Sequence, residues 1–198
     1  MPLFSIAGSQ GSGKSTTLSN LPEFSSVTRK TSRSVLADWN VSLDEVNNDH
    51  NLLIKFQDEI LHRKISDEQQ YANSPNPCVT ERTYADLFTY ALIALGKDNQ
   101  HSEWLNQYYD KCKQAQSTYS ATFYLTAGHF APVADGVRGT NVHYSRMADL
   151  TMYDCTQSMT APTKLITISD PNLSNRVQIV RNYINHVHPL NAKCNSGI

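Results

Sequence analysis

GSQGSGKS, at residues 8–15, is the most informative stretch of this sequence. It fits G-x-x-x-x-G-K-[ST], the phosphate-binding P-loop. The preceding run LFSIA, residues 3–7, predicts a short buried strand, and residues 15–21 predict a helix. A strand, a glycine-rich loop and a helix in this order are the context that the motif requires. A Gly/Ser-rich turn that matches by chance is the alternative, and the surrounding pattern argues against it.

The residue types of this loop explain how it can hold a nucleoside triphosphate. Three glycines let the backbone curl until successive N–H groups point inward, and the helix N-terminus adds partial positive charge. Lys14 can reach the β- and γ-phosphates, and the Ser15 hydroxyl can bind Mg²⁺. The predicted ATP-binding residues are Gly8, Gln10, Gly11, Ser12, Gly13, Lys14, Ser15 and Thr16. The motif alone does not separate kinases from switches and motors.

Length and composition bound the remaining possibilities. The 198 residues suit one α/β domain, predicted to span residues 1–198. With 17 basic and 18 acidic residues, the overall charge does not suggest a protein that coats nucleic acid or membranes. The four cysteines form no C-x-x-C pair, which favours free thiols in a reducing compartment. We find no apolar run of membrane-spanning length and no room for a signal peptide before the P-loop, so we expect a cytoplasmic protein.

Alternating apolar patterns predict the rest of the architecture. Further strands are expected at residues 24–28, 78–80, 120–126 and 165–168. Further helices are expected at residues 51–65, 84–95, 104–112, 145–159 and 173–187. Such alternation implies a three-layer α/β fold, with a parallel sheet of about five strands and helices on both faces. A polar, glycine-containing loop at residues 128–141 suggests a lid, taken as residues 128–146.

Polar side chains gather at the predicted carboxyl ends of these strands, where parallel sheets bind ligands. Phosphoryl transfer needs cations at the acceptor, a carboxylate near the metal or the attacking oxygen, and usually a lid that carries an arginine. Glu81 and Arg82 follow the strand at residues 78–80, and Arg138 lies in the lid. The predicted catalytic residues are Lys14, Glu81, Arg82 and Arg138, the predicted Mg²⁺ ligands are Ser15 and Glu81, and further acceptor contacts are predicted at Arg29, Arg33 and Arg146. The alternative for each arginine is an ordinary surface ion pair.

These residues resemble the P-loop nucleoside and nucleotide kinases, and most closely the thymidylate-kinase-like proteins of bacteriophages. The segment TERTYADLFTYA, residues 80–91, resembles the D-R-Y region of thymidylate kinases and, at Glu81, Arg82 and Thr83, the E-R-S of deoxynucleoside kinases. TRKT at residues 28–31 stands where thymidylate kinases carry T-R-E-P, and DGVR at residues 135–138 resembles the lid of ribosylnicotinamide kinases. The resemblance implies an ATP- and Mg²⁺-dependent kinase in the cytoplasm, or in the host cytoplasm if a phage encodes it.

By this resemblance, Arg82 would hold the acceptor, Glu81 would organise Mg²⁺ or the attacking hydroxyl, and Arg138 would close over the transferring group. Phe56 would stack on the acceptor base, with plain core packing as its favoured alternative. Two departures leave the base open, because Lys30 replaces the acid of T-R-E-P and Ala91 replaces a base-reading Gln.

Three functions therefore remain open at this stage. The first is a kinase acting on a deoxynucleoside monophosphate or a nucleoside. The second is a kinase acting on 5-hydroxymethyluracil within DNA, which would require a pocket for an exposed base. The third is a nucleotide-dependent switch without an acceptor, against which the arginines on the acceptor side argue. No membrane partner is expected, and the sequence leaves a homodimer open.

Overall fold

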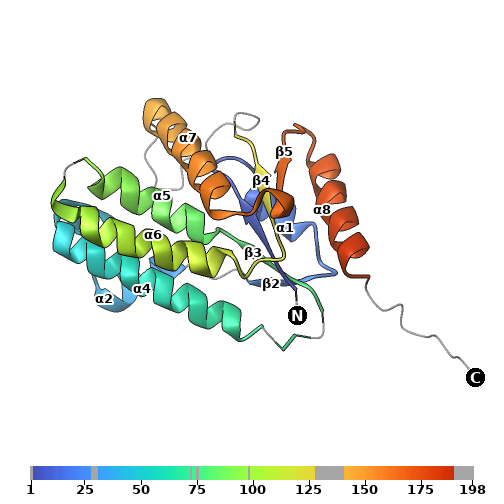
Figure 1. Cartoon of the computed structure of the whole chain (residues 1–198), viewed down its shortest axis with the longest axis horizontal. Helices are drawn as coiled ribbons and strands as arrows, with labels where there is room; N and C mark the ends of the chain where they lie inside the picture. Colours follow the sequence, from blue (N-terminus) through green and yellow to red (C-terminus); the bar gives the residue numbers. More distant parts are fainter. Residues whose placement is uncertain are drawn as a thin grey trace, which may run out of the picture.

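The computed structural model describes residues 2–27, 31–71, 73–74, 76–97, 99–127 and 141–189 (Figure 1). Its strands are β1 (Leu3–Ala7), β2 (Ser25–Val27), β3 (Cys78–Glu81), β4 (Ala121–Leu125) and β5 (Leu165–Ile168). Its α-helices are α1 (Lys14–Ser19), α2 (Thr31–Trp39), α3 (Leu43–Asn48), α4 (His50–Gln69), α5 (Tyr84–Leu95), α6 (Ser102–Gln116), α7 (Val142–Met159) and α8 (Leu173–Val187). Short 3₁₀ turns lie at Asn99–His101 and Pro162–Lys164.

The five described strands form one parallel sheet in the order β2-β3-β1-β4-β5. The first strand lies at the centre, with Ile6 opposite Glu81 of β3 on one side and Phe123 of β4 on the other. This order brings the residues that follow β1 next to those that follow β3 and β4. The predicted parallel α/β sheet is thus confirmed.

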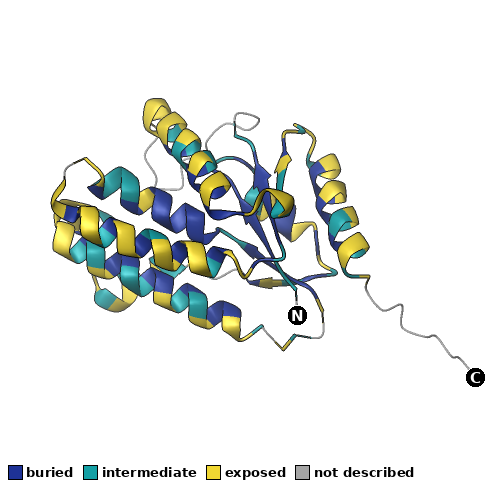
Figure 2. Ribbon diagram, in the orientation of Figure 1, coloured by how far each residue is buried: buried dark blue, intermediate teal, exposed yellow. Residues whose placement is uncertain are grey.

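Helices cover both faces of the sheet (Figures 1 and 2). On one face, Phe4 and Ile6 of β1 pack in an apolar cluster with Leu18 of α1 and Val180 of α8. On the other face, α4, α5, α6 and α7 form a larger apolar cluster around the buried α5. Alternate residues of a strand point to opposite faces, so each buried strand contributes to both layers. The predicted three-layer arrangement is confirmed.

Two described helices, α2 and α3, were not expected from the sequence. The buried Val35 and its apolar neighbours attach α2 to α4, together with an ion pair between Asp38 of α2 and Arg63 of α4 at 2.5 Å. α3 has six residues, and its start is fixed by a capping box in which Ser42 and Glu45 bond to each other's backbone N–H. The S-x-x-E spacing of residues 42–45 is the sequence signal that would have located α3.

Most predicted elements have nearly the expected bounds, and capping explains two helices that begin early. β1, β5, α5 and α8 begin and end where the pattern predicts. α4 and α7 begin earlier than expected, because Asp49 and Asn141 accept hydrogen bonds from the first backbone N–H groups of these helices.

Among the described residues we find no helix with the length and apolar character that crossing a bilayer requires. Three cysteines, Cys78, Cys112 and Cys155, are buried free thiols.

Candidate active site

The P-loop joins β1 to α1 at the carboxyl edge of the sheet. Gly8, Gly11 and Gly13 have φ angles of 138°, 77° and 87°, a region that side chains with a Cβ rarely adopt. A Cβ on Gly8 would lie 2.5 Å from the Leu125 carbonyl oxygen and 2.7 Å from Ser12 Oγ. The loop therefore lies closely against the end of β4, and glycine is required for that approach. The loop conformation fits the phosphate cradle that the sequence predicts.

The side chain of Lys14, the first residue of α1, folds back against the P-loop. Its Nζ donates hydrogen bonds to the carbonyl oxygens of Gly8, at 2.5 Å, and Ser9, at 2.8 Å. Phosphate oxygens are stronger acceptors than carbonyl oxygens for an ammonium group, so a bound triphosphate can take over these bonds. Ser15 and Thr16 are exposed on the first turn of α1, where hydroxyl groups can reach a metal ion or a phosphate.

Glu81 and Arg82 lie beside the P-loop strand, as the sequence predicts. The Arg82 backbone N–H donates to the Ile6 carbonyl oxygen at 3.1 Å, which ties the end of β3 to β1. Arg82 has a φ of 65°, a left-handed conformation that is unusual for a residue with a side chain. Such conformations persist only where the surrounding structure holds them in place, and they are frequent at functional sites.

The residues of this edge fit a Mg²⁺ ion. Glu81 Oε2 is buried and accepts no hydrogen bond from any residue that the structure describes. A buried carboxylate oxygen without a donor is costly unless a cation compensates it. α1, which carries the exposed Ser15, contacts β3, at whose end Glu81 lies. Ser15 and Glu81 thus supply oxygen atoms of the kind that Mg²⁺ prefers.

Asp86, which the sequence analysis did not single out, belongs to the same charged group. Its Oδ1 accepts a hydrogen bond from the Thr83 hydroxyl at 2.9 Å, within the first turn of α5. Burial raises the pKa of the Asp86 carboxyl, while the charges of Lys14 and Arg82 and the Thr83 hydroxyl act in the opposite direction. Asp86 is thus a buried acid within electrostatic reach of both predicted cations. The T-x-x-D spacing of residues 83–86 was the available signal.

Two adjoining cavities lie on the β2–β3 side of the P-loop. Arg82, Glu81 and Lys64 line the first, a narrow space in which Lys64 Nζ contacts Glu68 at 2.6 Å and Thr80 Oγ1 at 3.2 Å. The second has a volume of about 780 Å³ and is lined by polar side chains that include Arg33. Thr31 and Asp67 line both cavities. The structure therefore brings Arg33 and Arg82 to one continuous polar region.

The other predicted acceptor contacts have different outcomes. Phe56 is only 3% exposed and packs edge-on against Trp39 in the helical core, so the core-packing alternative holds and stacking on a base is not supported. Arg146 is exposed on α7 and lines neither of the two cavities. Arg29 and Arg138, with most of the predicted lid, lie outside the described residues.

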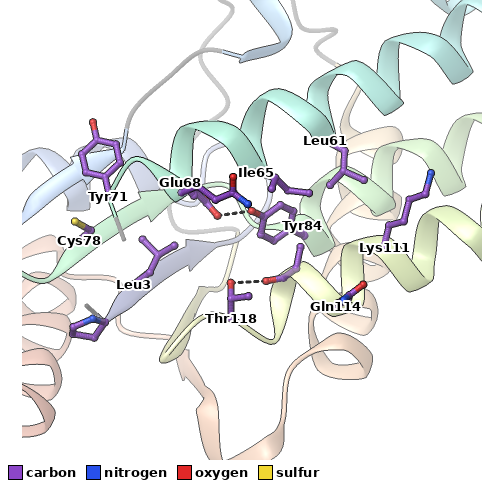
Figure 3. A pocket seen from close by; sticks show the side chains of 13 residues that line it. Leu3, Leu61, Ile65, Glu68, Tyr71, Cys78, Tyr84, Lys111, Gln114 and Thr118 are labelled. Atoms are coloured by element: carbon purple, nitrogen blue, oxygen red, sulfur yellow. Dashed lines mark hydrogen bonds between the residues drawn. The ribbon is translucent and has the colours of Figure 1, made fainter. Parts of the chain in front are cut away.

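A further cavity, of about 550 Å³, lies away from the P-loop (Figure 3). Leu3 and Cys78, at the starts of β1 and β3, line it together with Ile65 and Tyr84. It thus opens at the amino edge of the sheet, opposite the predicted nucleotide site. Within its lining the Glu68 carboxylate accepts a hydrogen bond from the Tyr84 hydroxyl at 2.6 Å. No group of three or more potential metal ligands of the His, Cys, Asp and Glu types occurs in the described ranges.

Comparison with known proteins places this geometry in a family. Residues 3–170 match the family described as AAA domain. The chain belongs to this AAA domain family. No curated protein sequence matches the chain.

Solved structures with the same fold include a NadR protein, a deoxyadenosine kinase and a thymidylate kinase. A NadR protein in complex with NR has a TM-score of 0.72 at 14% identity, and covers 92% of this chain and 51% of its own. A deoxyadenosine kinase from M. mycoides with the products dCMP and dCDP has a TM-score of 0.67 at 15% identity, over 93% of this chain and 99% of its own. A thymidylate kinase from Candida albicans has a TM-score of 0.59 at 15% identity, over 94% and 92%. The chain thus spans about half of NadR and nearly all of the deoxyadenosine kinase.

Proposed function

We propose that the protein is an ATP-dependent phosphotransferase that transfers the γ-phosphoryl group to a nucleoside or a deoxynucleoside monophosphate. The observation that carries the proposal is the junction of β1 and β3. There the P-loop and the strained Arg82 are tied together through the Ile6 carbonyl oxygen, with Glu81 and a polar cavity alongside. A P-loop provides the donor half of such a site, and an arginine beside it suits a phosphorylated or hydroxylated acceptor.

The residues divide into donor and acceptor roles. The inward N–H groups of the P-loop and the Lys14 ammonium would hold the β- and γ-phosphates, once the ammonium leaves the Gly8 and Ser9 carbonyl oxygens. Mg²⁺, held by Ser15 and Glu81, would neutralise charge on these phosphates. The Arg82 guanidinium would orient the acceptor by a two-pronged contact that a lysine cannot reproduce.

Further arginines would complete the acceptor half of the site. Arg33 lines the polar cavity that adjoins Arg82, and it would contact a charged part of the acceptor. Arg29 follows β2 in the sequence and would reach the same region. Arg138 and Arg146 would approach from the lid at residues 128–146, and Arg138 would cover the transferring group. The named ligands of the M. mycoides enzyme, dCMP and dCDP, support a deoxynucleoside compound as acceptor.

An acceptor screen with γ-labelled ATP tests this function. The panel contains free nucleosides, deoxynucleoside monophosphates, and duplex DNA with or without 5-hydroxymethyluracil, with Lys14→Ala as the inactive control. Label on a free nucleoside or nucleotide is the expected result. If only the modified DNA is labelled, the acceptor is a DNA base and not a free nucleoside or nucleotide. If ATP is hydrolysed and no acceptor is labelled, the protein is a nucleotide-dependent switch and not a kinase.

A further inference from the structure

The buried guanidinium of Arg176 lies behind the P-loop. Arg176 is fully buried in α8, between Leu173 and Val180 of the apolar stripe of that helix. Its guanidinium donates to three backbone carbonyl oxygens from distant parts of the chain. The acceptors are Ser12 in the P-loop, at 2.5 Å, Thr126 after β4, at 3.4 Å, and Asp170 before α8.

The contact with Ser12 bears on the phosphate site because of peptide geometry. The peptide unit is planar, and no cis bond occurs in the described chain. In a trans peptide the C=O and the following N–H point in opposite directions. Arg176 holds the Ser12 carbonyl oxygen on the buried side, so the N–H of Gly13 is directed away from Arg176. In a P-loop such N–H groups are the ones that contact phosphate oxygens.

The other two contacts fix the position of the guanidinium itself. Thr126 N–H donates to the Ile168 carbonyl oxygen at 3.2 Å, so the ends of β4 and β5 are already joined. The turn after β5 is held by Asp170, whose carboxylate accepts from the Asn172 N–H at 2.7 Å and from Asn175 Nδ2 at 2.9 Å. Two hydrogen-bonded segments, at Thr126 and Asp170, therefore hold the guanidinium in place, and its third contact is with Ser12 of the P-loop.

Stability alone does not account for an arginine at this position. Taking a charge out of water is costly, and apolar residues of similar size often replace buried ionic groups without loss of stability. The neighbouring positions of the stripe, Val177 and Val180, are apolar and buried. The arginine adds what they cannot, namely directed donors and a positive charge next to a loop that binds anions.

We propose that Arg176 is a positioning residue of the nucleotide site, which fixes the Ser12–Gly13 peptide for contact with the phosphates of ATP. The inference rests on the donor half of the proposed function and is independent of the acceptor. It assigns to α8 a role in phosphate binding without any direct contact between that helix and the ligand.

The experiment compares Arg176→Met and Arg176→Lys with a matched control on the same helix. Arg181→Met is the control, because Arg181 also joins α8 to a distant segment, but away from the P-loop. Its side chain contacts Glu23 at 2.5 Å and the Asn20 carbonyl oxygen at 3.0 Å, both in the segment that follows α1. ATP affinity is measured by calorimetry well below the unfolding temperature, and KM is measured for the best acceptor. Residues that orient the ligands of a metal ion contribute roughly 10–100-fold in metal affinity, and we expect the same range for a residue that orients a phosphate-binding peptide.

We expect Arg176→Met to weaken ATP binding by roughly that factor, with the acceptor KM unchanged, and Arg181→Met to leave both within about twofold. Arg176→Lys keeps the charge but not the fork of donors, so its ATP affinity should fall between wild type and Arg176→Met. If Arg176→Met does not fold, the lysine variant decides, and it must still bind ATP more weakly than Arg181→Met. Wild-type affinity for ATP in the Arg176 variants would overturn the inference. Failure of the wild-type protein to bind ATP would instead overturn the proposed function and the inference with it.

Discussion

Replacing Arg82 by asparagine should separate activity from stability. Arg82 has a φ of 65° at the end of β3. A left-handed conformation costs a residue with an ordinary side chain about 1–2 kcal/mol, and asparagine tolerates it better. The Arg82→Asn protein should therefore be as stable as wild type or about 1 kcal/mol more stable, which raises the Tm of a domain of this size by roughly 2–4 °C.

The same change should remove most of the phosphoryl transfer. A preorganised electrostatic contact in an active site is worth about 2–4 kcal/mol in the transition state. At about 1.36 kcal/mol for each factor of ten, kcat/KM for the acceptor should fall by roughly 30- to 1,000-fold. ATP affinity, which depends on the P-loop, should remain close to wild type.

Asn40 provides the reciprocal control. It is exposed at the end of α2 and has a φ of 52°, so Asn40→Arg places an arginine in the same conformation away from the P-loop. We expect that variant to lose about 1 kcal/mol of stability and no activity. Thermal unfolding, ATP titration and acceptor kinetics are measured on both proteins. If Arg82→Asn keeps its kcat/KM, or loses as much stability as Asn40→Arg, the assignment of Arg82 as a strained functional residue is wrong.

Three further changes test the donor side. Lys14→Ala should abolish transfer while Tm stays near wild type, because the side chain lies on loop carbonyl oxygens rather than in the apolar core; retained turnover would contradict the P-loop assignment. Gly8→Ala should weaken ATP binding and lower Tm together, since its Cβ would lie 2.5 Å from the Leu125 carbonyl oxygen; a neutral effect in calorimetry and thermal unfolding would show that the loop is not closely packed. Asp86→Asn should flatten the pH dependence of the free energy of unfolding. Burial raises the Asp86 pKa in the folded protein, so the wild-type protein loses stability as pH rises past the ordinary pKa of 3.8. This loss levels off above the raised pKa of the folded protein. Denaturant unfolding between acid and neutral pH checks this, and parallel curves for the two proteins would refute it.

The parts of the fold that the sequence predicts are those with strong local signals. The P-loop has a fixed spacing, α5 is apolar nearly all round, and α8 has apolar residues at three- and four-residue intervals. α2 has neither property, because tertiary contacts with α4 hold it in place, namely the packing of Val35 and the Asp38–Arg63 ion pair. Such helices gain most of their stability from contacts that a single sequence does not display.

The candidate site shows the same division. The side-by-side arrangement of Glu81 and the P-loop was predictable, because the ends of parallel strands meet at one edge of the sheet. Phe56 lies on an apolar stripe, and a stripe alone cannot tell a base platform from core packing. The sequence analysis missed Arg176 because a charged residue on the apolar face of a helix departs from the expected pattern. Arg176 stands three positions after Leu173 and four before Val180, on the face that the apolar stripe buries.

The central place of β1 has a consequence for how the chain is made. β1 is synthesised before both of its neighbouring strands, which begin at residues 78 and 121, so it lacks one of its two neighbours until β4 is synthesised. At common rates of translation this interval is roughly 6–25 s. During that time the nascent chain carries an apolar segment and an unsupported P-loop, which lacks the Leu125 backbone against which Gly8 packs. A ligand stabilises only the state that binds it, so a nucleotide in the P-loop can stabilise the chain only after β4 has been synthesised.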